Sequence, residues 1–262
     1  MDLNQLNSAL LSMSAGMEGE VSIAIHTDEG SIGIDADVPR KAASVAKLFI
    51  LGEAYRRLES NLLSFDKLVY IDHQSMVGGS GVISYLKNAH VYSYQNLIEL
   101  MIIVSDNTAS NALLDAIGME DINHFSKSIG CQHTIIERKF MDIEAAEKGK
   151  DNITTANDVV CLLKLFSREN DYFPNKSRRE ILRILGDQQF NNKLSTFNPN
   201  TPNIRFYRKT GELQGVEHDA AIIEANGKRI EAAILTEGWK NNGTGQHYIA
   251  EVGQLIIDYL ID

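Results

Sequence analysis

Three short motifs carry the residue types from which a serine nucleophile could be built. Residues 44–47 read SVAK, a spacing that places the amine of Lys47 on the same helix face as the hydroxyl of Ser44. Residues 105–107 read SDN and residues 209–211 read KTG, so a second hydroxyl, an amide and a second amine follow along the chain. A serine hydroxyl attacks a carbonyl well only when a base within hydrogen-bond reach takes its proton. Together the motifs predict acyl transfer through Ser44, with Lys47 as the base.

The context of Ser44 separates the first motif from two others with the same spacing. Residues 64–67 and 84–87 also read SxxK, but only Ser44 opens a long apolar helix directly after a predicted strand hairpin. A serine at a helix start is surrounded by backbone N–H groups and the positive end of the helix dipole, where an oxyanion could form. Each motif alone is typical of a capped helix, a turn or a strand end. Their occurrence in this order, on the element types that their roles need, favours one site.

A lysine can act as a base only when it is neutral. The reference pKa of lysine, about 10.4, leaves Lys47 protonated at neutral pH. A second ammonium, Lys209, about 4 Å away would repel it by roughly 4 kcal/mol at an effective dielectric constant of 20, or about 3 pKa units. Half of that repulsion would already make neutral Lys47 accessible. We therefore expect Lys209 to lie beside Lys47.

The elements that must position these residues follow from hydrophobic periodicity, which predicts strands at both ends of the chain and helices in the middle. Asn226-Gly227 between two apolar runs is the strongest hairpin signal, and residues 28–30 (DEG) mark a second one. We therefore predict an α/β (α+β) fold: one antiparallel sheet built from both termini, flanked by the terminal helices, with an inserted all-helical domain. The expected domains are residues 1–60 with 195–262, and residues 61–194.

Composition excludes several classes of function. The chain has 262 residues, 44% of them apolar, which suits a packed globular protein. A net charge of −10 argues against electrostatic binding of nucleic acid, and no apolar run approaches the roughly 18 to 20 residues of a membrane span. No metal-ligand cluster or cofactor fingerprint is present, so we expect neither metal nor cofactor.

The same features give expectations about compartment and assembly. The N-terminal stretch lacks the basic start and apolar segment of a secretory signal, which predicts a cytoplasmic protein, or an exported one if a leader has been removed. Cys131 and Cys161 have no CxxC or zinc spacing, and we interpret both as reduced. We expect a monomer that acts on a small molecule.

The order SxxK, SDN, KTG is the signature of class A β-lactamases and penicillin-binding proteins. This chain resembles that family, and more specifically its class A branch, over nearly its whole length. Residues 77–82 (VGGSGV) and 218–221 (HDAA) look like the family as well. The resemblance implies a two-domain β-lactamase/transpeptidase-like fold with the active site between the domains.

The resemblance also implies roles for the first two motifs. Ser44 would form an acyl-enzyme, and Lys47 would be its base. Ser105 would relay a proton to the leaving nitrogen, while Asn107 would orient Lys47 and bind a substrate amide.

For the third motif, the resemblance implies a substrate-binding strand. Lys209 and Thr210 would bind the carboxylate that is usual in β-lactams and peptidoglycan stems. Gly211 would allow close approach of the backbone to the ligand. The oxyanion hole would use the backbone N–H groups of Ser44 and Glu212.

The sequence differs from the family pattern at two places where a charged side chain is lost or gained. The ExxLN glutamate that activates the deacylating water is absent: aligned on Arg138 its place falls near Phe140, and aligned on the later threonines it falls on Lys139. Where β-lactamases often have an arginine or small polar residue, after KTG, this chain has Glu217. Three nearby carboxylates could replace the missing glutamate, although spacing supports none of them: Glu137, Asp142 and Glu144.

These departures predict efficient acylation with uncertain deacylation, because Glu212 and Glu217 also disfavour an anionic substrate unless they point away. The leading interpretation is a serine hydrolase of the class A β-lactamase type that opens β-lactam amides through Ser44. The alternatives are a D-Ala-D-Ala peptidase or esterase, and a penicillin-binding sensor that is acylated without turnover. A Ser-His-Asp enzyme is disfavoured because no GxSxG elbow occurs.

Overall fold

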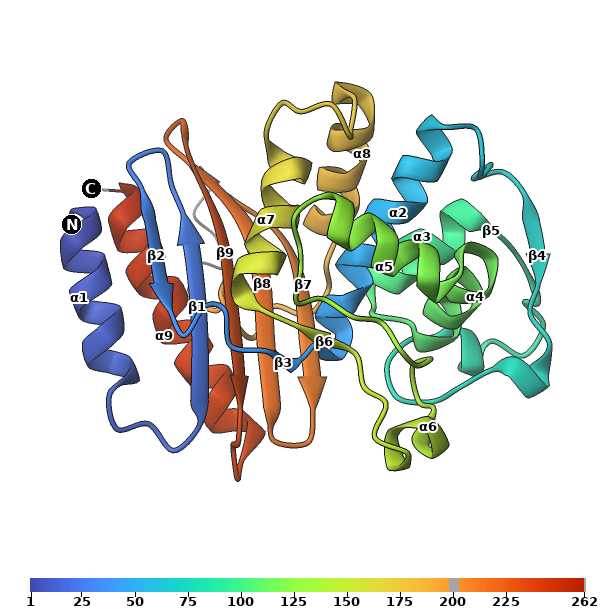
Figure 1. The fold of residues 1–262 in the computed structure, drawn as a ribbon, viewed down its shortest axis with the longest axis horizontal. Helices are drawn as coiled ribbons and strands as arrows, with labels where there is room; N and C mark the ends of the chain where they lie inside the picture. Colours follow the sequence, from blue (N-terminus) through green and yellow to red (C-terminus); the bar gives the residue numbers. More distant parts are fainter. Residues whose placement is uncertain (198–202, 262) are drawn as a thin grey trace.

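The computed structural model describes residues 1–197 and 203–261. Its central element is one antiparallel sheet with the strand order β2-β1-β9-β8-β7. The N-terminal and C-terminal helices lie together on one face of this sheet, and the remaining helices lie beyond its other face and β7 edge (Figure 1). The sheet strands are β1 (Glu20–His26), β2 (Ser31–Ile34), β7 (Ile204–Leu213), β8 (Val216–Ala225) and β9 (Lys228–Glu237).

The helices and short elements complete the description. The α-helices are α1 (Leu3–Ser14), α2 (Lys47–Glu59), α3 (Tyr94–Ile103), α4 (Asn107–Ile117), α5 (Met119–Ser128), α6 (Ile143–Glu147), α7 (Ala156–Ser167), α8 (Asn175–Gly186) and α9 (Asn242–Ile261). Two short ribbons pair β3 (Arg40–Lys41) with β6 (Ile153–Thr154), and β4 (Leu68–Tyr70) with β5 (Val91–Ser93). The 3₁₀ turns are η1 (Ala43–Ala46), η2 (His73–Ser75) and η3 (Ile83–Tyr85).

Both predicted hairpins are present. Strands β8 and β9 pair from Val216–Glu237 to Ala225–Lys228, which leaves Asn226 and Gly227 as the two turn residues. Both have positive φ angles, 52° and 78°, as this tight hairpin requires. The turn between β1 and β2 lies at residues 27–30, and the predicted hairpin there is therefore confirmed.

The sheet separates two hydrophobic cores because successive side chains of a strand point to opposite faces. On β8, Ala220 and Ile222 belong to the core shared with α2 to α5, α7 and α8. Ala221 and Ile223 belong to the core shared with α1 and α9. Strand β8 is therefore buried on both faces, and this burial includes the polar residues Glu217, His218 and Asp219.

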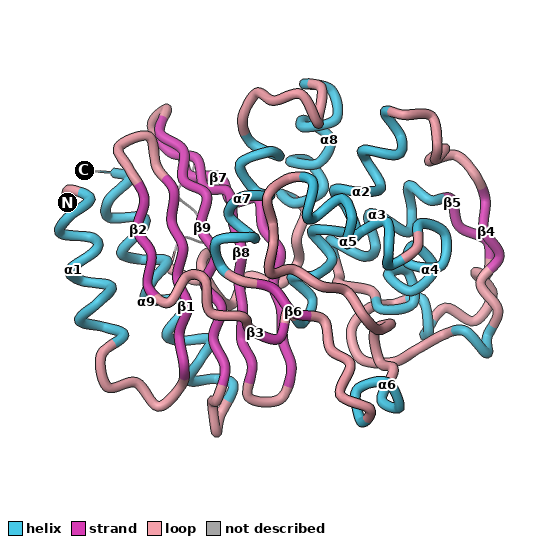
Figure 2. Tube along the Cα trace, viewed as in Figure 1, coloured by secondary structure: helices cyan, strands magenta, loops and turns pink. Residues whose placement is uncertain are grey.

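The segment predicted as an inserted helical domain is mainly helical and also holds β4, β5 and β6 (Figure 2). Its helices α7 and α8 pack against the sheet, α7 on β9 and α8 on β7. Helix α2 passes between the sheet and helices α3 to α5, with Leu48, Phe49 and Leu51 fully buried. The predicted α/β architecture is confirmed, while the boundaries at residues 61 and 194 stay a prediction.

Other expectations can be compared directly with the described residues. Cys131 and Cys161 are both free thiols, as predicted. Within the described ranges no helix is long and apolar enough to cross a bilayer. Nor do three or more metal-ligating side chains gather in that part of the chain.

Helix α9 packs closely against the segment that precedes β7, and this contact can be tested. A methyl group at Gly253 would overlap the carbonyl group of Leu194. We expect Gly253→Ala to lower the free energy of unfolding by about 2 kcal/mol, because overpacking forces the backbone to shift. Urea unfolding followed by circular dichroism measures this change.

The control is Gly243→Ala at the start of the same helix, where only the Asn241 side chain lies within 4 Å. Its unfolding free energy should change by less than about 0.5 kcal/mol. Equal stability of the two variants would show that α9 does not pack on Leu194.

Candidate active site

The turn before α2 presents Ser44 at the free edge of β7. Ser44 lies in η1, a correction to the expectation that it opens an α-helix, because the α-helix begins at Lys47. The preceding Ala43 has a φ angle of 45°, an uncommon conformation for a residue with a side chain. A side chain at Gly211 would lie 3.2 Å from Val45 and 3.3 Å from Ala43. Glycine therefore lets β7 approach the Ser44 turn closely.

Lys47 projects from the first turn of α2 into a fully buried position. Three oxygen atoms surround its Nζ: Ser105 O at 2.7 Å, Asn107 Oδ1 at 2.8 Å and Ser105 Oγ at 3.1 Å. Asn107 in turn donates from its Nδ2 to the Gly78 carbonyl at 3.0 Å. Lys47 is thus held by the SDN motif, as the expected role of Asn107 requires.

The SDN loop is held in place by its central carboxylate. Asp106 Oδ2 accepts hydrogen bonds from the backbone N–H groups of Val82, at 2.6 Å, and Ile83, at 2.8 Å. Its Oδ1 accepts from Ala109 N at 2.9 Å and so caps α4. Ser105 has a φ angle of 56°, an uncommon left-handed conformation that these contacts maintain. The result is that the Ser105 hydroxyl faces Lys47.

Lys209 reaches the same hydroxyl from the opposite side. Its Nζ lies 3.0 Å from Ser105 Oγ and 2.8 Å from the Thr210 carbonyl oxygen. Lys47, Ser105 and Lys209 come from α2, the loop between α3 and α4, and β7. The structure therefore brings the polar groups of all three motifs together, and Ser105 Oγ joins the two amines.

Burial is the main reason that both amines favour the neutral form. It lowers the pKa of Lys47 well below its usual range, and the Lys209 ammonium lowers that pKa further against an opposing effect of Asp106. Burial likewise lowers the pKa of Lys209 to about 7, with a further contribution from Lys193. From the sequence, we expected repulsion by Lys209 to lower the pKa of Lys47. Desolvation lowers the two lysine pKa values more than repulsion does, because neither lysine is exposed to water.

Two cavities flank Ser44. The smaller one has a volume of about 190 Å³ and is lined by Ser44, Ser80, Ser105, Phe190, Asn192, Lys193, Thr210 and Glu212. The larger one has about 270 Å³ and includes Asn107, Phe140, Met141, Asp142, Ile143 and Leu213, with Ser44, Ser80 and Glu212 shared between the two. A substrate could therefore lie across Ser44 with one part in each cavity.

Phe140 lies where the alignment on Arg138 places the missing glutamate. Arg138 pairs with Asp151 at 2.8 Å, and Asn111 fixes the backbone of Phe140 through two hydrogen bonds, of 2.8 and 3.0 Å. The Phe140 ring centroid is 4.5 Å from Lys47 Nζ. An aromatic ring, rather than a carboxylate, therefore covers Lys47 on this side.

The three carboxylates considered as replacements have other positions. Glu137 and Glu144 are exposed, and Glu144 pairs with Lys148 at 2.5 Å. Asp142 lines the larger cavity, but its Oδ1 accepts from Ala145 N at 2.9 Å and caps α6. Only Asp142 thus adjoins the site, and it is engaged in the helix cap.

Two charged residues behind β7 belong to the site without having been predicted as a pair. Lys193 is 1% exposed and forms an ion pair with Glu217, which is fully buried. The sequence analysis noted Glu217 but missed Lys193, because a lysine in the polar run NNKLS is typical of a solvated loop. Only the fold reveals that this loop crosses behind β7.

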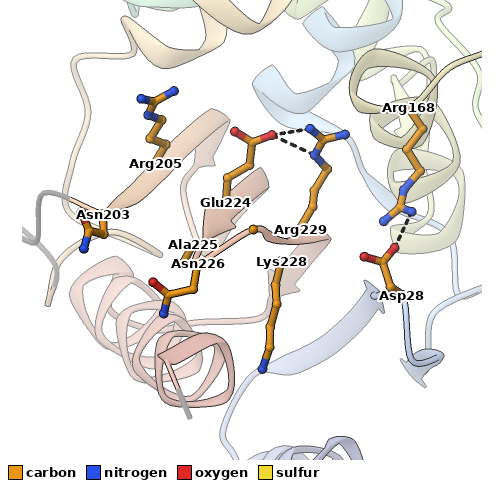
Figure 3. A pocket seen from close by; sticks show the side chains of 10 residues that line it. Asp28, Arg168, Asn203, Arg205, Glu224, Ala225, Asn226, Lys228 and Arg229 are labelled. Atoms are coloured by element: carbon orange, nitrogen blue, oxygen red, sulfur yellow. Dashed lines mark hydrogen bonds and ion pairs between the residues drawn. The ribbon is translucent and has the colours of Figure 1, made fainter.

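A larger hollow lies elsewhere, at the end of the β8–β9 hairpin, with a volume of about 660 Å³ (Figure 3). Four of its charged side chains bind one another in pairs: Arg168 pairs with Asp28 at 2.7 Å, and Arg229 pairs with Glu224 at 2.5 Å. The described residues that line it include no serine, cysteine or histidine.

Known proteins share this architecture. A β-lactamase structure from Sphaerobacter thermophilus superposes with a TM-score of 0.90 at 24% identity, over 98% of this chain and 97% of that one. The structure of PBP-A superposes with a TM-score of 0.87 at 22% identity, over 98% and 96% of the two chains. These similarities confirm the predicted β-lactamase/transpeptidase-like fold.

Sequence comparison leads to the family. β-Lactamase AER-1 of Aeromonas hydrophila is 25% identical over 148 residues, 56% of this chain and 48% of that protein, so the match spans about half of this relative. The model of the β-lactamase enzyme family matches residues 4–260, nearly the full length. The resemblance suggested by the three motifs is confirmed: the chain belongs to the β-lactamase enzyme family, a family of serine hydrolases.

Proposed function

We propose that this protein opens β-lactam amides through an acyl-enzyme on Ser44 and that the acyl-enzyme is hydrolysed slowly. The observation that carries acylation is the position of Ser105 Oγ, 3.1 Å from Lys47 Nζ and 3.0 Å from Lys209 Nζ. The observation that carries slow hydrolysis is the Phe140 ring beside Lys47.

The contacts of Lys47 suit a neutral amine, which donates two hydrogen bonds and has one lone pair. Its two N–H groups can donate to Ser105 O and Asn107 Oδ1, at 2.7 and 2.8 Å. Ser105 Oγ accepts from Lys209 Nζ at 3.0 Å and lies 3.1 Å from Lys47 Nζ, and the lone pair of neutral Lys47 is left to take the proton of Ser44. Ser105 thus connects the proposed base, Lys47, to Lys209, a second group that can carry a proton.

In the acylation step, the Ser44 oxygen bonds to the lactam carbonyl carbon while its proton passes to neutral Lys47. The ring C–N bond then breaks, and the proton moves from Lys47 through the Ser105 hydroxyl to the leaving nitrogen. The backbone N–H groups of Ser44 and Glu212 stabilise the negative charge on the carbonyl oxygen. Thr210 and Asn107 lie in the two adjoining cavities, where they can bind substrate.

Deacylation requires a water molecule with a base beside it. The side chain at the expected place is Phe140, 8% exposed, which can neither take a proton nor hold a water molecule by hydrogen bonds. Asp142 is occupied as the α6 cap. Hydrolysis of the acyl-enzyme ester is therefore slower than its formation.

The first test mixes the protein with a chromogenic cephalosporin and follows colour release and intact mass. We expect a stoichiometric burst, an adduct on Ser44 and slow steady turnover; Ser44→Ala should show neither burst nor adduct. Fast sustained turnover would contradict the slow step. Absence of any adduct would contradict the acylation. Rapid release of D-Ala from a D-Ala-D-Ala peptide would instead support the peptidase alternative.

A second test supplies the missing base. Phe140→Glu places a carboxylate beside Lys47, and we expect the acyl-enzyme lifetime to shorten at least about tenfold, at the low end of general-base contributions. Phe140→Gln is the matched control, similar in size but without a base. If both variants keep the parent lifetime, or shorten it equally, Phe140 does not limit deacylation.

A third test uses pH. Because the pKa of Lys209 is lowered to about 7, its ammonium is largely present at pH 6 and largely lost at pH 8. The acylation rate constant should therefore fall as pH rises through about 7, because the positive charge of Lys209 beside Ser105 disappears. Stopped-flow measurements from pH 5.5 to 9 test this, with Lys209→Arg, which keeps its charge, as the control. A parent rate that stays flat or rises across this interval would contradict the assignment.

A further inference from the structure

Lys193 and Lys209 lie at the smaller cavity beside Ser44, but little of their positive charge is available to a ligand. The charged side chains that line this cavity are Lys193 and Glu212, and Lys209 lies beneath Thr210. A cavity that accepts a carboxylate needs a cation with a free hydrogen-bond donor or an excess of positive charge. Each of these side chains can be tested against that requirement.

Lys193 has no donor left for a ligand. Its Nζ donates to the carbonyl oxygens of Gly211 and His218, at 2.9 and 3.2 Å, which face each other across β7 and β8. Its third contact is the ion pair with Glu217. An ammonium group has three N–H bonds, and all three are used. The charge of Lys193 is therefore compensated inside the protein.

Glu217 is itself fixed. Its Oε1 accepts hydrogen bonds from Asn242 Nδ2 at 2.7 Å and from Gln246 Nε2 at 3.0 Å, both from the first turns of α9. A carboxylate held from two sides and fully buried keeps its ion pair in place. Lys193 is thus a structural cation behind β7.

Glu212 adds a negative charge beside the Lys193–Glu217 pair: burial and then the Glu217 charge raise its pKa, and attraction by Lys193 lowers that pKa. Glu212 is exposed and lines both cavities, and no hydrogen bond or ion pair reaches its carboxylate from the described residues. Lys209 donates to Ser105 Oγ and to the Thr210 carbonyl, and it is fully buried behind the described residues that line the cavity. Of the two charged side chains in that lining, Glu212 is therefore the one that no hydrogen bond or ion pair between described residues holds.

We propose that this cavity selects acyl donors with an uncharged group, such as a carboxamide, where β-lactams of the ordinary kind carry a carboxylate. The inference rests on the proposed function, because it concerns the substrate of the same Ser44 site. Its physical basis is the repulsion between Glu212 and an anionic ligand, because the single charge of Lys193 is already paired with Glu217. The acylation chemistry is unchanged: the Ser44 Oγ–C bond forms, the lactam C–N bond breaks, and the proton moves to the nitrogen.

The test compares benzylpenicillin with its carboxamide, two probes of nearly equal shape that differ by one negative charge. Second-order rate constants for adduct formation are measured by intact mass. We expect the carboxamide to acylate the parent protein at least as fast as the acid. In Glu212→Gln, the ratio of the acid rate to the carboxamide rate should rise about tenfold, since Coulomb energies at this range correspond to such factors.

The control is Glu251→Gln on α9, which removes the same charge from an exposed position outside both cavities. Its rate ratio should equal that of the parent. A parent that acylates faster with the acid, together with an unchanged ratio in Glu212→Gln, overturns the inference and leaves the proposed function standing. If neither probe forms an adduct, the proposed function fails and the inference with it. The parent ratio needs no variant, so a misfolded Glu212→Gln would not prevent a decision.

Discussion

The burial of two lysine side chains around one serine hydroxyl is the constraint on which this site depends. Lys47 and Lys209 are both fully buried, and Ser105 Oγ lies 3.1 and 3.0 Å from their nitrogen atoms. Two buried ammonium groups at such separations repel each other and lose their hydration, so at least one favours its neutral form. A lysine in its neutral form can accept a proton and so can act as a base at neutral pH. The favoured neutral form also explains why hydrogen bonds to carbonyl and amide oxygens, instead of carboxylates, hold Lys47.

The fold maintains this arrangement through a few close contacts. Gly211 allows the edge strand β7 to approach the Ser44 turn, and Asp106 fixes the loop that carries Ser105. Behind β7, the Lys193–Glu217 pair connects the strand to α9. The proposed preference of the cavity for uncharged ligands rests on the same pair, because it compensates the charge of Lys193 inside the protein. In the proposed mechanism, Phe140 on the other side of the site lengthens the lifetime of the acyl-enzyme, because its ring brings no base to Lys47.

Much of this could be predicted from the sequence where local chemistry determines the structure. Turn residues at Asn226-Gly227 and alternating apolar runs predicted the sheet. The three motifs predicted that Ser44, Lys47 and Lys209 meet; the structure joins the two lysines through Ser105 Oγ and places Ser44 in the lining of the adjoining cavities. The dominance of desolvation over repulsion could not be predicted, because it depends on how completely the lysines are buried. Lys193 was missed for a related reason: its polar neighbours in sequence are not its neighbours in space.

The measurement that tests this account most directly is the titration of the lysine side chains by NMR, with ¹³C-labelled lysine and with Lys47→Arg and Lys209→Arg for assignment. The account predicts that Lys47 titrates well below the ordinary lysine value of about 10.4 and is neutral at pH 7. Lys209 should titrate at about 7. A Lys47 signal that stays charged up to the ordinary value would contradict the account, since no neutral base would then stand beside Ser44.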